Sequence, residues 1–129
     1  MNKMSFFNAI LGNASTTDKN EVKKELAPLL LNDEEIDAAF KLIRDLIVFT
    51  NKRLILIDKQ GITGKKVEYH SLPYKSISHF SVETAGRFDL DSELKVWVSG
   101  AEAPVINKQF RKDNSIFDIQ KILAEVCMK

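Results

Sequence analysis

Three carboxylates in the second half of the chain have the spacing most suggestive of chemistry. Asp89, Asp91 and Glu93 alternate along the sequence, so on an extended chain they would lie on one face. Hard cations such as Ca²⁺ bind where several oxygen ligands converge. The calcium loop of an EF-hand needs glycine at its sixth position, and Leu94 stands there in this chain. We therefore interpret the segment as a solvated acidic turn, with metal binding as the alternative.

A second set of residues could bind an anion. Lys52 and Arg53 lie at one expected hairpin turn, and Lys65 and Lys66 follow a second, glycine-rich turn. If both turns lie near one end of a sheet, these four side chains could bind a lipid headgroup or an acidic peptide. The glycines lack the spacing of a nucleotide-binding P-loop. With a formal net charge of +1 we favour ordinary solvated charge at the turns, with anion binding as the alternative.

Residues that commonly act as nucleophiles, bases or zinc ligands are few. His70, His79 and Cys127 are far apart in the sequence and lack the spacing of a zinc site. Neither a nucleophile–base pair nor a catalytic triad can be recognised from the sequence. We therefore expect a protein that is not an enzyme, with no catalytic residues, no cofactor and no metal.

Length, composition and charge limit the class of protein. A chain of 129 residues with 44% apolar and 29% charged residues can fold as one domain with a real core. A general nucleic-acid-binding protein should have a strong basic field, and the formal net charge of +1 argues against such a partner. One cysteine excludes an intrachain disulfide, and neither a signal peptide nor a membrane-spanning apolar run is recognisable. These features predict a cytoplasmic location.

Helical periodicity marks both ends of the chain. Residues 1–31 are expected to form a helical extension, and residues 32–129 the rest of one domain. The first helix of the extension carries an apolar stripe made of Phe6, Phe7, Ile10 and Leu11. A second helix should begin near Asp18 and end or kink near Pro28. The last helix of the chain should begin near residue 115.

Seven short apolar segments between residues 34 and 111 have the features of β-strands joined by turns. In the first segment Ile36, Ala38 and Phe40 recur at every second position, which predicts that they share one face of a strand. The alternation slips in the fifth segment near residues 78–79, which predicts a β-bulge. Short strands followed by one helix favour a barrel or sandwich over a βαβ fold.

Two of these strands, residues 46–49 and 54–57, are apolar on both faces. A strand with one face in water should alternate, so both strands need cover on two sides. A barrel core supplies one cover, and the N-terminal helices, a second subunit or another partner must supply the other. If a second subunit does so, the expected interface residues are Ile47, Phe49, Ile55 and Ile57.

Several blocks of sequence, in order, resemble the bacterial pleckstrin-homology-like family over about residues 20–128. The blocks are FTNKRLI (49–55), QG (60–61), TGKK (63–66), LPY (72–74), ETAG (83–86) and FDLD (88–91). The resemblance implies a mainly β (α+β) fold. This fold is a pleckstrin-homology-like, seven-stranded, partly open barrel with a capping C-terminal helix, here preceded by the N-terminal helical extension. It also implies ring-like homo-oligomers, since members of the family tend to form them.

The resemblance and the two-faced strands together predict a non-enzymatic interaction or scaffold module that assembles with copies of itself. A peptide or another protein is a further expected partner. The alternative is a membrane adaptor that binds an anion or lipid headgroup through the turn lysines. Many eukaryotic pleckstrin-homology domains bind phosphoinositides through a basic motif in the first hairpin. Here residues 41–45 contain two basic residues and an acid, which departs from that motif.

Overall fold

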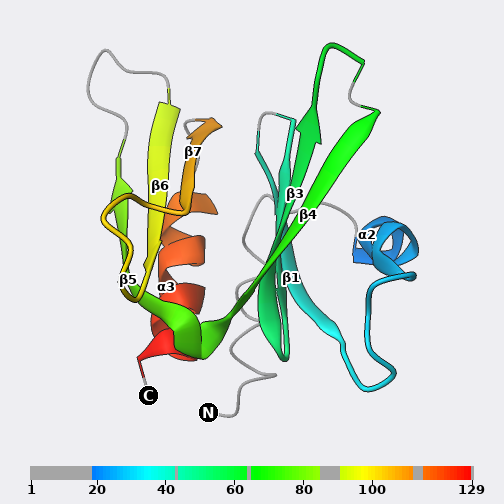
Figure 1. Ribbon diagram of the computed structural model, residues 1–129, viewed down its shortest axis with the longest axis horizontal. Coiled ribbons are helices and arrows are strands. Elements are labelled where there is room, and N and C mark those ends of the chain that lie inside the picture. Colours follow the sequence, from blue (N-terminus) through cyan, green and yellow to red (C-terminus); the bar gives the residue numbers. More distant parts are fainter. Residues whose placement is uncertain (1–18, 43, 64, 85–90, 112–114, 129) are drawn as a thin grey trace. The chain divides into compact units, whose positions relative to one another are not determined.

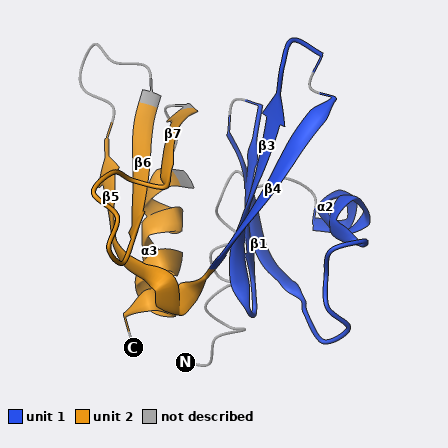
Figure 2. Cartoon of the chain, in the orientation of Figure 1, with its two compact units in different colours: residues 1–72 blue, residues 73–129 orange. Residues whose placement is uncertain are grey.

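The computed structural model describes residues 19–42, 44–63, 65–84, 91–111 and 115–128. The chain divides into two compact units, residues 1–72 (unit 1) and 73–129 (unit 2) (Figure 2). Unit 1 contains α2 (Lys19–Leu26), β1 (Ile36–Lys41), β2 (Leu46–Thr50), β3 (Arg53–Gln60) and β4 (Lys66–Pro73). Unit 2 contains the 3-10 turn η1 (Tyr74–Ser76), β5 (Ile77–Glu83), β6 (Asp91–Val98), β7 (Ile106–Arg111) and α3 (Ser115–Cys127) (Figure 1).

The predicted order of seven strands and one terminal helix is confirmed. The described strands form two sheets, β1-β2-β3-β4 and β5-β6-β7, which are not joined into a closed barrel. β4 ends at Pro73, as expected for a residue that cannot donate to a ladder. The second predicted helix ends at Leu26, two residues before Pro28, whereas the first lies outside the described residues.

The sheet of unit 1 is an antiparallel meander whose register separates two apolar faces. β2 and β3 are joined by a tight turn at residues 51–52, and Val48 pairs with Ile55 while Ile47 pairs with Leu56. Paired residues point to the same side and neighbours to opposite sides. Hence the side chains at 46, 48, 55 and 57 lie on one face of the sheet, and those at 47, 49, 54 and 56 on the other.

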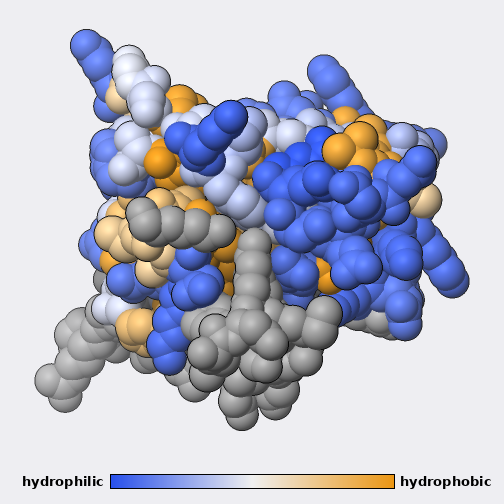
Figure 3. Space-filling model, turned by 90° about the horizontal axis from the view of Figure 1, so that it is seen from below, coloured by the Kyte–Doolittle hydropathy of each residue, from blue (hydrophilic) through white to orange (hydrophobic). Residues whose placement is uncertain are grey.

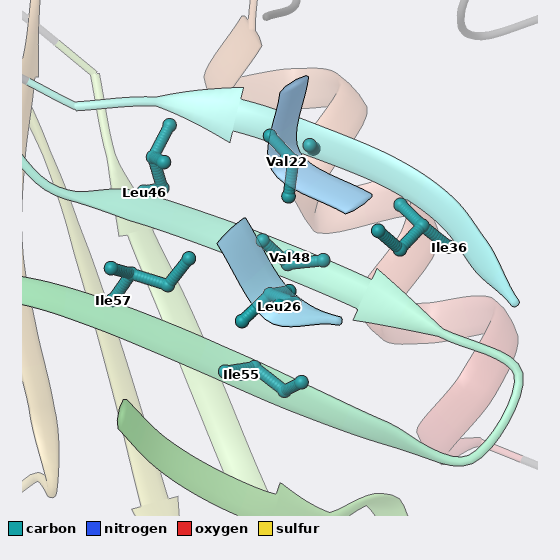
Figure 4. Close-up of a cluster of buried hydrophobic side chains, with 8 residues drawn as sticks. Val22, Leu26, Ile36, Leu46, Val48, Ile55 and Ile57 are labelled. Carbon is teal, nitrogen blue, oxygen red and sulfur yellow. The ribbon is translucent and has the colours of Figure 1, made fainter. Parts of the chain in front are cut away.

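Helix α2 covers the first of these faces. Val22 and Leu26 pack with Val48, Ile55 and Ile57 in one buried cluster (Figure 4). The rest of α2 is polar: five of its residues, Lys19, Asn20, Glu21, Lys23 and Lys24, are exposed. On the face of the molecule seen in Figure 3, hydrophilic side chains gather over unit 1 around a small hydrophobic patch. Because α2 is apolar on one side and polar on the other, it covers this face of the sheet and excludes water from it.

A β-bulge in β1 changes which of its side chains point to each face of the sheet. The β1–β2 register shifts between Ile36 and Ala38, so Ile36 joins Ala39 in the α2 cluster. Ala38 and Phe40 lie on the opposite face, where the Phe40 and Phe49 rings meet edge to face with centroids 6.2 Å apart. The prediction that Ile36 shares a face with Ala38 and Phe40 is therefore wrong, because one extra residue reverses the alternation.

Unit 2 is a three-stranded sheet with α3. The predicted slip in the fifth strand is confirmed as a register shift between Ile77 and His79. The helix contacts β5, β6 and η1, and its apolar residues Ile116, Ile119, Ile122, Leu123 and Val126 are buried. Leu94 and Val96 of β6 are buried as well. Among the described residues, no helix has the length and hydropathy needed to cross a membrane.

Candidate functional site

The four predicted anion-binding residues do not come together. Lys52 lies in the β2–β3 turn and Arg53 begins β3, whereas Lys65 lies between β3 and β4 and Lys66 begins β4. Successive turns of an antiparallel meander lie at opposite ends of the sheet. The eight residues of β3 span about 25 Å at the usual rise per residue. The expectation that these turns share one end is therefore wrong, and the set divides into two pairs.

Arg53 is held in a buried ion pair. Its Nε donates to Oε2 of Glu34 at 2.9 Å, and its Nη2 donates to Oε1 of the same carboxylate at 2.9 Å. The Thr50 hydroxyl donates to Oε2 at 2.6 Å, and the Leu31 amide to Oε1 at 3.1 Å. The Glu34 side chain is 0% exposed. This bidentate geometry is the strongest form of arginine–carboxylate contact.

The remaining donors of Arg53 reach two other segments of unit 1. Nη2 also donates to the Leu29 carbonyl at 2.9 Å, and Nη1 donates to Oγ of Ser71 in β4 at 3.0 Å. One guanidinium thus joins β3 and β4 to the connection between α2 and β1. Because its donors are used in this way, Arg53 has a structural role and does not present its charge to an external anion.

The environment of Glu34 strongly favours its charged form. Burial is the largest influence and would raise its pKa, but hydrogen bonds from Arg53, Thr50 and the Leu31 amide, with the arginine charge, together lower the pKa to about 2. Glu34 is therefore ionised at neutral pH. Since both of its oxygens already accept hydrogen bonds, it is poorly suited to act as a general base. Sequence reasoning missed this residue, which has no local signal beyond preceding the first strand.

Other residues of the β2–β3 turn also bind the connection between α2 and β1. Lys52 Nζ lies 3.1 Å from a carboxylate oxygen of Asp33, which lowers the pKa of Asp33. Asn51 accepts a hydrogen bond from the Glu35 amide at 2.8 Å and donates to the Asp33 carbonyl at 3.0 Å. A pocket of about 220 Å³ between α2 and this connection has both lysine and glutamate residues in its lining. These contacts position α2.

The opposite end of the unit 1 sheet, which holds the β1–β2 and β3–β4 turns, has exposed basic side chains. Arg44 donates from Nη2 to the Gly61 carbonyl at 2.6 Å, and the Lys59 amide donates to Oδ1 of the buried Asp45 at 3.0 Å. The first bond joins the β1–β2 turn to the β3–β4 turn, and the second joins the β1–β2 turn to the end of β3. Lys65 and Lys66 are exposed there, beside Ile62, whose relative exposure is 103%. Gly61 has φ = +76°, a conformation that favours glycine.

The predicted interface residues are buried within a single chain. Ile47, Phe49, Ile55 and Ile57 are each 0% exposed. The register places the first two on one face of the sheet and the last two on the other, under α2. The structure therefore does not gather them into one surface, and α2 supplies the cover that Ile55 and Ile57 required. Self-assembly stays a prediction, and it needs other residues.

The acidic segment is described only in part. Asp89 and the side chain of Asp91 lie outside the described residues, and Glu93 pairs with Lys95 at 3.1 Å. Within the described part of the chain, no group of three or more His, Cys, Asp or Glu side chains is placed to hold a metal ion. Cys127 is half-buried on α3, and burial raises the pKa of its thiol, which makes it a weak nucleophile at neutral pH.

An aromatic pair that sequence reasoning did not single out lies on the sheet of unit 2. His79 of β5 pairs with Trp97 of β6, and their rings stack with centroids 4.4 Å apart and planes 18° apart. Ser78 Oγ lies 3.1 Å from Nδ1 of His79 and donates to the Trp97 carbonyl at 3.3 Å. Trp97 is the only tryptophan in the chain, and its place between Val96 and Val98 was the available signal.

Trp97 points away from the buried side of this sheet. Leu94 and Val96 alternate with it along β6 and are fully buried. The face that it shares holds His79, Ser81, Glu93, Lys95 and Asn107, which are exposed or half-buried. We call these five residues, together with Trp97, the Trp97 face. It is an aromatic platform within a polar surface, suited to contact.

The chain is similar to two proteins of Bacillus subtilis (strain 168). It is 70% identical to the uncharacterized protein YjqA over 125 residues, which cover 97% of this chain and all of YjqA. It is 36% identical to the uncharacterized protein YozO over 102 residues, which cover 79% of this chain and 86% of YozO.

Solved structures agree in fold. A crystal structure of a pleckstrin homology domain from Shewanella amazonensis SB2B matches with a TM-score of 0.80 and 52% identity, covering 96% of this chain and 99% of that one. A DUF1696 family protein with a pleckstrin-homology domain from Shewanella loihica PV-4 matches with a TM-score of 0.74 and 52% identity, covering 89% and 97%. The family model for the bacterial PH domain matches residues 5–127. The chain therefore belongs to the bacterial PH domain family.

Proposed function

We propose that this protein is a non-enzymatic interaction module that assembles with copies of itself through the Trp97 face. The observation that carries the proposal is the half-exposed ring of Trp97, stacked on His79 on an otherwise polar face of the β5–β6 pair. Tryptophan is enriched at the centres of protein interfaces, because a large rigid ring buries much area at little cost in conformational entropy. A polar surround of this kind suits an interface rim.

The charges of the Trp97 face suit a second copy as the partner. Lys95 and Glu93 lie on the same side of β6 and form an ion pair at 3.1 Å, so the surface offers both signs of charge. A patch of mixed sign can face itself without net repulsion, as a self-complementary contact requires. The resemblance to a family that tends to form ring-like homo-oligomers supports the same partner. A ring requires that Trp97 contact a different surface of its neighbour, whereas a two-fold contact gives a dimer.

The first test is the absolute mass in solution, measured by light scattering after size exclusion at two protein concentrations. We expect one discrete multiple of 14.6 kDa that persists on dilution. Because Trp97 is the only tryptophan, its fluorescence reports on this face alone. We expect protection from an aqueous quencher in the assembled protein. A mass of one chain at every concentration would contradict the proposal.

Two variants separate the Trp97 face from other surfaces. Trp97→Ser should lower the mass to that of fewer chains, and so should Lys95→Glu, which places two acids side by side without removing apolar contacts. Ile62→Ser is the matched control, because Ile62 is exposed in unit 1. Far-ultraviolet circular dichroism checks that each variant folds. Assembly that survives both Trp97→Ser and Lys95→Glu would assign the interface elsewhere.

A further inference from the structure

The pocket of unit 1 between α2 and the connection to β1 has the size of a site for a small molecule. Its volume is about 220 Å³. One water molecule occupies roughly 30 Å³ in the liquid, so the pocket can hold an organic molecule of several heavy atoms. Sites for drug-sized ligands usually measure roughly 300–1,000 Å³, and a ligand for this pocket must therefore be smaller.

Part of the lining of this pocket is apolar. Leu30 of the connection and Ile36, the first residue of β1, both line it. Ile36 is 9% exposed and belongs to the buried cluster under α2 (Figure 4), and Leu30 packs against the same cluster. An apolar group of a ligand in this position would extend the core of unit 1 and would remove apolar surface from water.

Three charged side chains line the same pocket. Lys19 and Lys23 are four residues apart on α2, so they lie on the same side of the helix. Glu35 comes from the connection, and all three residues are exposed. In the part of the chain that the structure describes, none of them takes part in an ion pair. The pocket therefore offers two cations and one carboxylate to a ligand.

The walls of the pocket are held in place by bonds within unit 1. Glu34 also lines the pocket, but both of its carboxylate oxygens accept hydrogen bonds from Arg53, so it supports the wall and does not offer its charge to a ligand. The Glu35 amide donates to Oδ1 of Asn51 at 2.8 Å, which fixes the backbone next to β1. Because the site is preorganised, binding requires little ordering of the chain.

We infer that this pocket binds a free α-amino acid with an apolar side chain, in its zwitterionic form. Lys19 and Lys23 contact the carboxylate, and Glu35 contacts the ammonium group. The side chain of the ligand lies against Leu30 and Ile36. A simple anion would leave Glu35 unpaired and the apolar lining in water, whereas an uncharged apolar molecule would desolvate the charges without pairing them. A zwitterion with an apolar group matches each part of the lining.

The test is titration of the intact, isotope-labelled protein with leucine, valine, methionine and phenylalanine at neutral pH, followed by amide chemical shifts in NMR spectra. We expect saturable shifts within residues 19–36 at millimolar concentrations of at least one of these amino acids. Glycine should bind at least about 10-fold more weakly, because it lacks the apolar group. The absence of a saturable shift with all four amino acids would overturn the inference.

Blocked forms of the bound amino acid separate a zwitterion site from a site for an anion or a peptide end. The N-acetyl form lacks the ammonium group, and the amide form lacks the carboxylate. Each should bind about 3–5-fold more weakly than the free amino acid, the effect of one exposed ion pair. If either form bound as tightly as the free amino acid, the pocket would recognise only one charge, and the assignment of a zwitterion would be overturned.

Substitutions of the charged residues test their contacts. Lys23→Gln and Glu35→Gln should each weaken binding by about 3–5-fold. Lys24→Gln is the matched control, since Lys24 is exposed on the same helix but is not among the described residues that line the pocket. Urea denaturation checks that each variant keeps its stability, as expected for exposed positions. An equal loss in Lys24→Gln, or an unchanged affinity in both Lys23→Gln and Glu35→Gln, would overturn the inference.

Discussion

Glu34 shows how a single carboxylate can become a structural rather than a chemical group. A buried acid without partners would have a raised pKa and would be a candidate proton donor or acceptor. Here Arg53, Thr50 and a backbone amide occupy both oxygens, and the pKa falls to about 2. The residue therefore stabilises the connection between α2 and β1 and does not provide a reactive group.

This geometry predicts a specific pH dependence of stability. The pKa of Glu34 is about 2 in the folded chain against 4.5 as its ordinary value, so its contribution is present above pH 4.5 and is lost as the pH falls toward 2. The difference corresponds to about 3 kcal/mol. Glu34→Gln should lower the free energy of unfolding by a similar amount at pH 7, and its deficit should shrink as the pH falls through this window. Urea denaturation at several pH values measures both.

The control for that prediction is Glu35→Gln. Glu35 is adjacent to Glu34 in the sequence but exposed, so its substitution should change the free energy of unfolding little at any pH. If both variants had the same stability and the same pH dependence, the hydrogen bonds of Glu34 with Arg53 and Thr50 would not contribute to stability as expected.

At the scale of elements, the most consequential contact is that of α2 with the sheet. The helix has eight residues, too few for stability on its own. Val22 and Leu26 anchor it over Val48, Ile55 and Ile57. Glu25 adds polar contacts, to Lys59 at 3.8 Å and to the Tyr69 hydroxyl at 3.3 Å. Packing on the sheet, together with the hydrogen bonds and ion pairs that hold the connection between α2 and β1, therefore stabilises this helix.

Leu26→Ala tests whether α2 is an integral cover. Leu26 is 0% exposed, so the change removes a buried side chain and should cost about 2–4 kcal/mol of unfolding free energy. It should also increase binding of an apolar dye, because the face below the helix becomes accessible. Leu31→Ala removes the same atoms from an exposed position and should have little effect. Equal costs for the two variants, measured by urea denaturation, would argue that α2 is not held in this position in solution.

At the scale of the whole molecule, the proposed interface and the Glu34–Arg53 network belong to different compact units. The Trp97 face lies in unit 2, and the network lies in unit 1. Self-assembly and the cover that α2 gives to its sheet therefore depend on different residues.

This separation predicts independent effects of substitutions. Glu34→Gln should lower the free energy of unfolding but leave the mass in solution unchanged while the chain stays folded, whereas Trp97→Ser should lower the mass. Substitutions at sites with no shared contacts are generally additive. Light scattering at neutral pH on both variants and their combination provides the comparison. A lower mass for folded Glu34→Gln would mean that assembly depends on unit 1 as well.

Some features of this protein follow from sequence alone because their causes are local. The strand order, the turn at residues 51–52, the irregularity near His79 and the buried stripe of α3 depend on short-range periodicity and turn residues. The sequence also shows that the strands at residues 46–49 and 54–57 are apolar on both faces, so that a second element must cover them. These patterns favour a barrel or sandwich followed by one helix, whereas the pleckstrin-homology-like fold was expected from the resemblance of several sequence blocks to that family.

Tertiary structure decided the rest, because it depends on pairing between residues distant in the chain. The bulge in β1 moved Ile36 to the other face, and the meander placed Lys52 and Lys66 at opposite ends of one sheet. Glu34 meets Arg53 across 19 positions, and His79 meets Trp97 across the β5–β6 ladder. Periodicity tells which residues alternate, whereas only strand register tells which of them become neighbours, and neighbours determine charge, burial and contact.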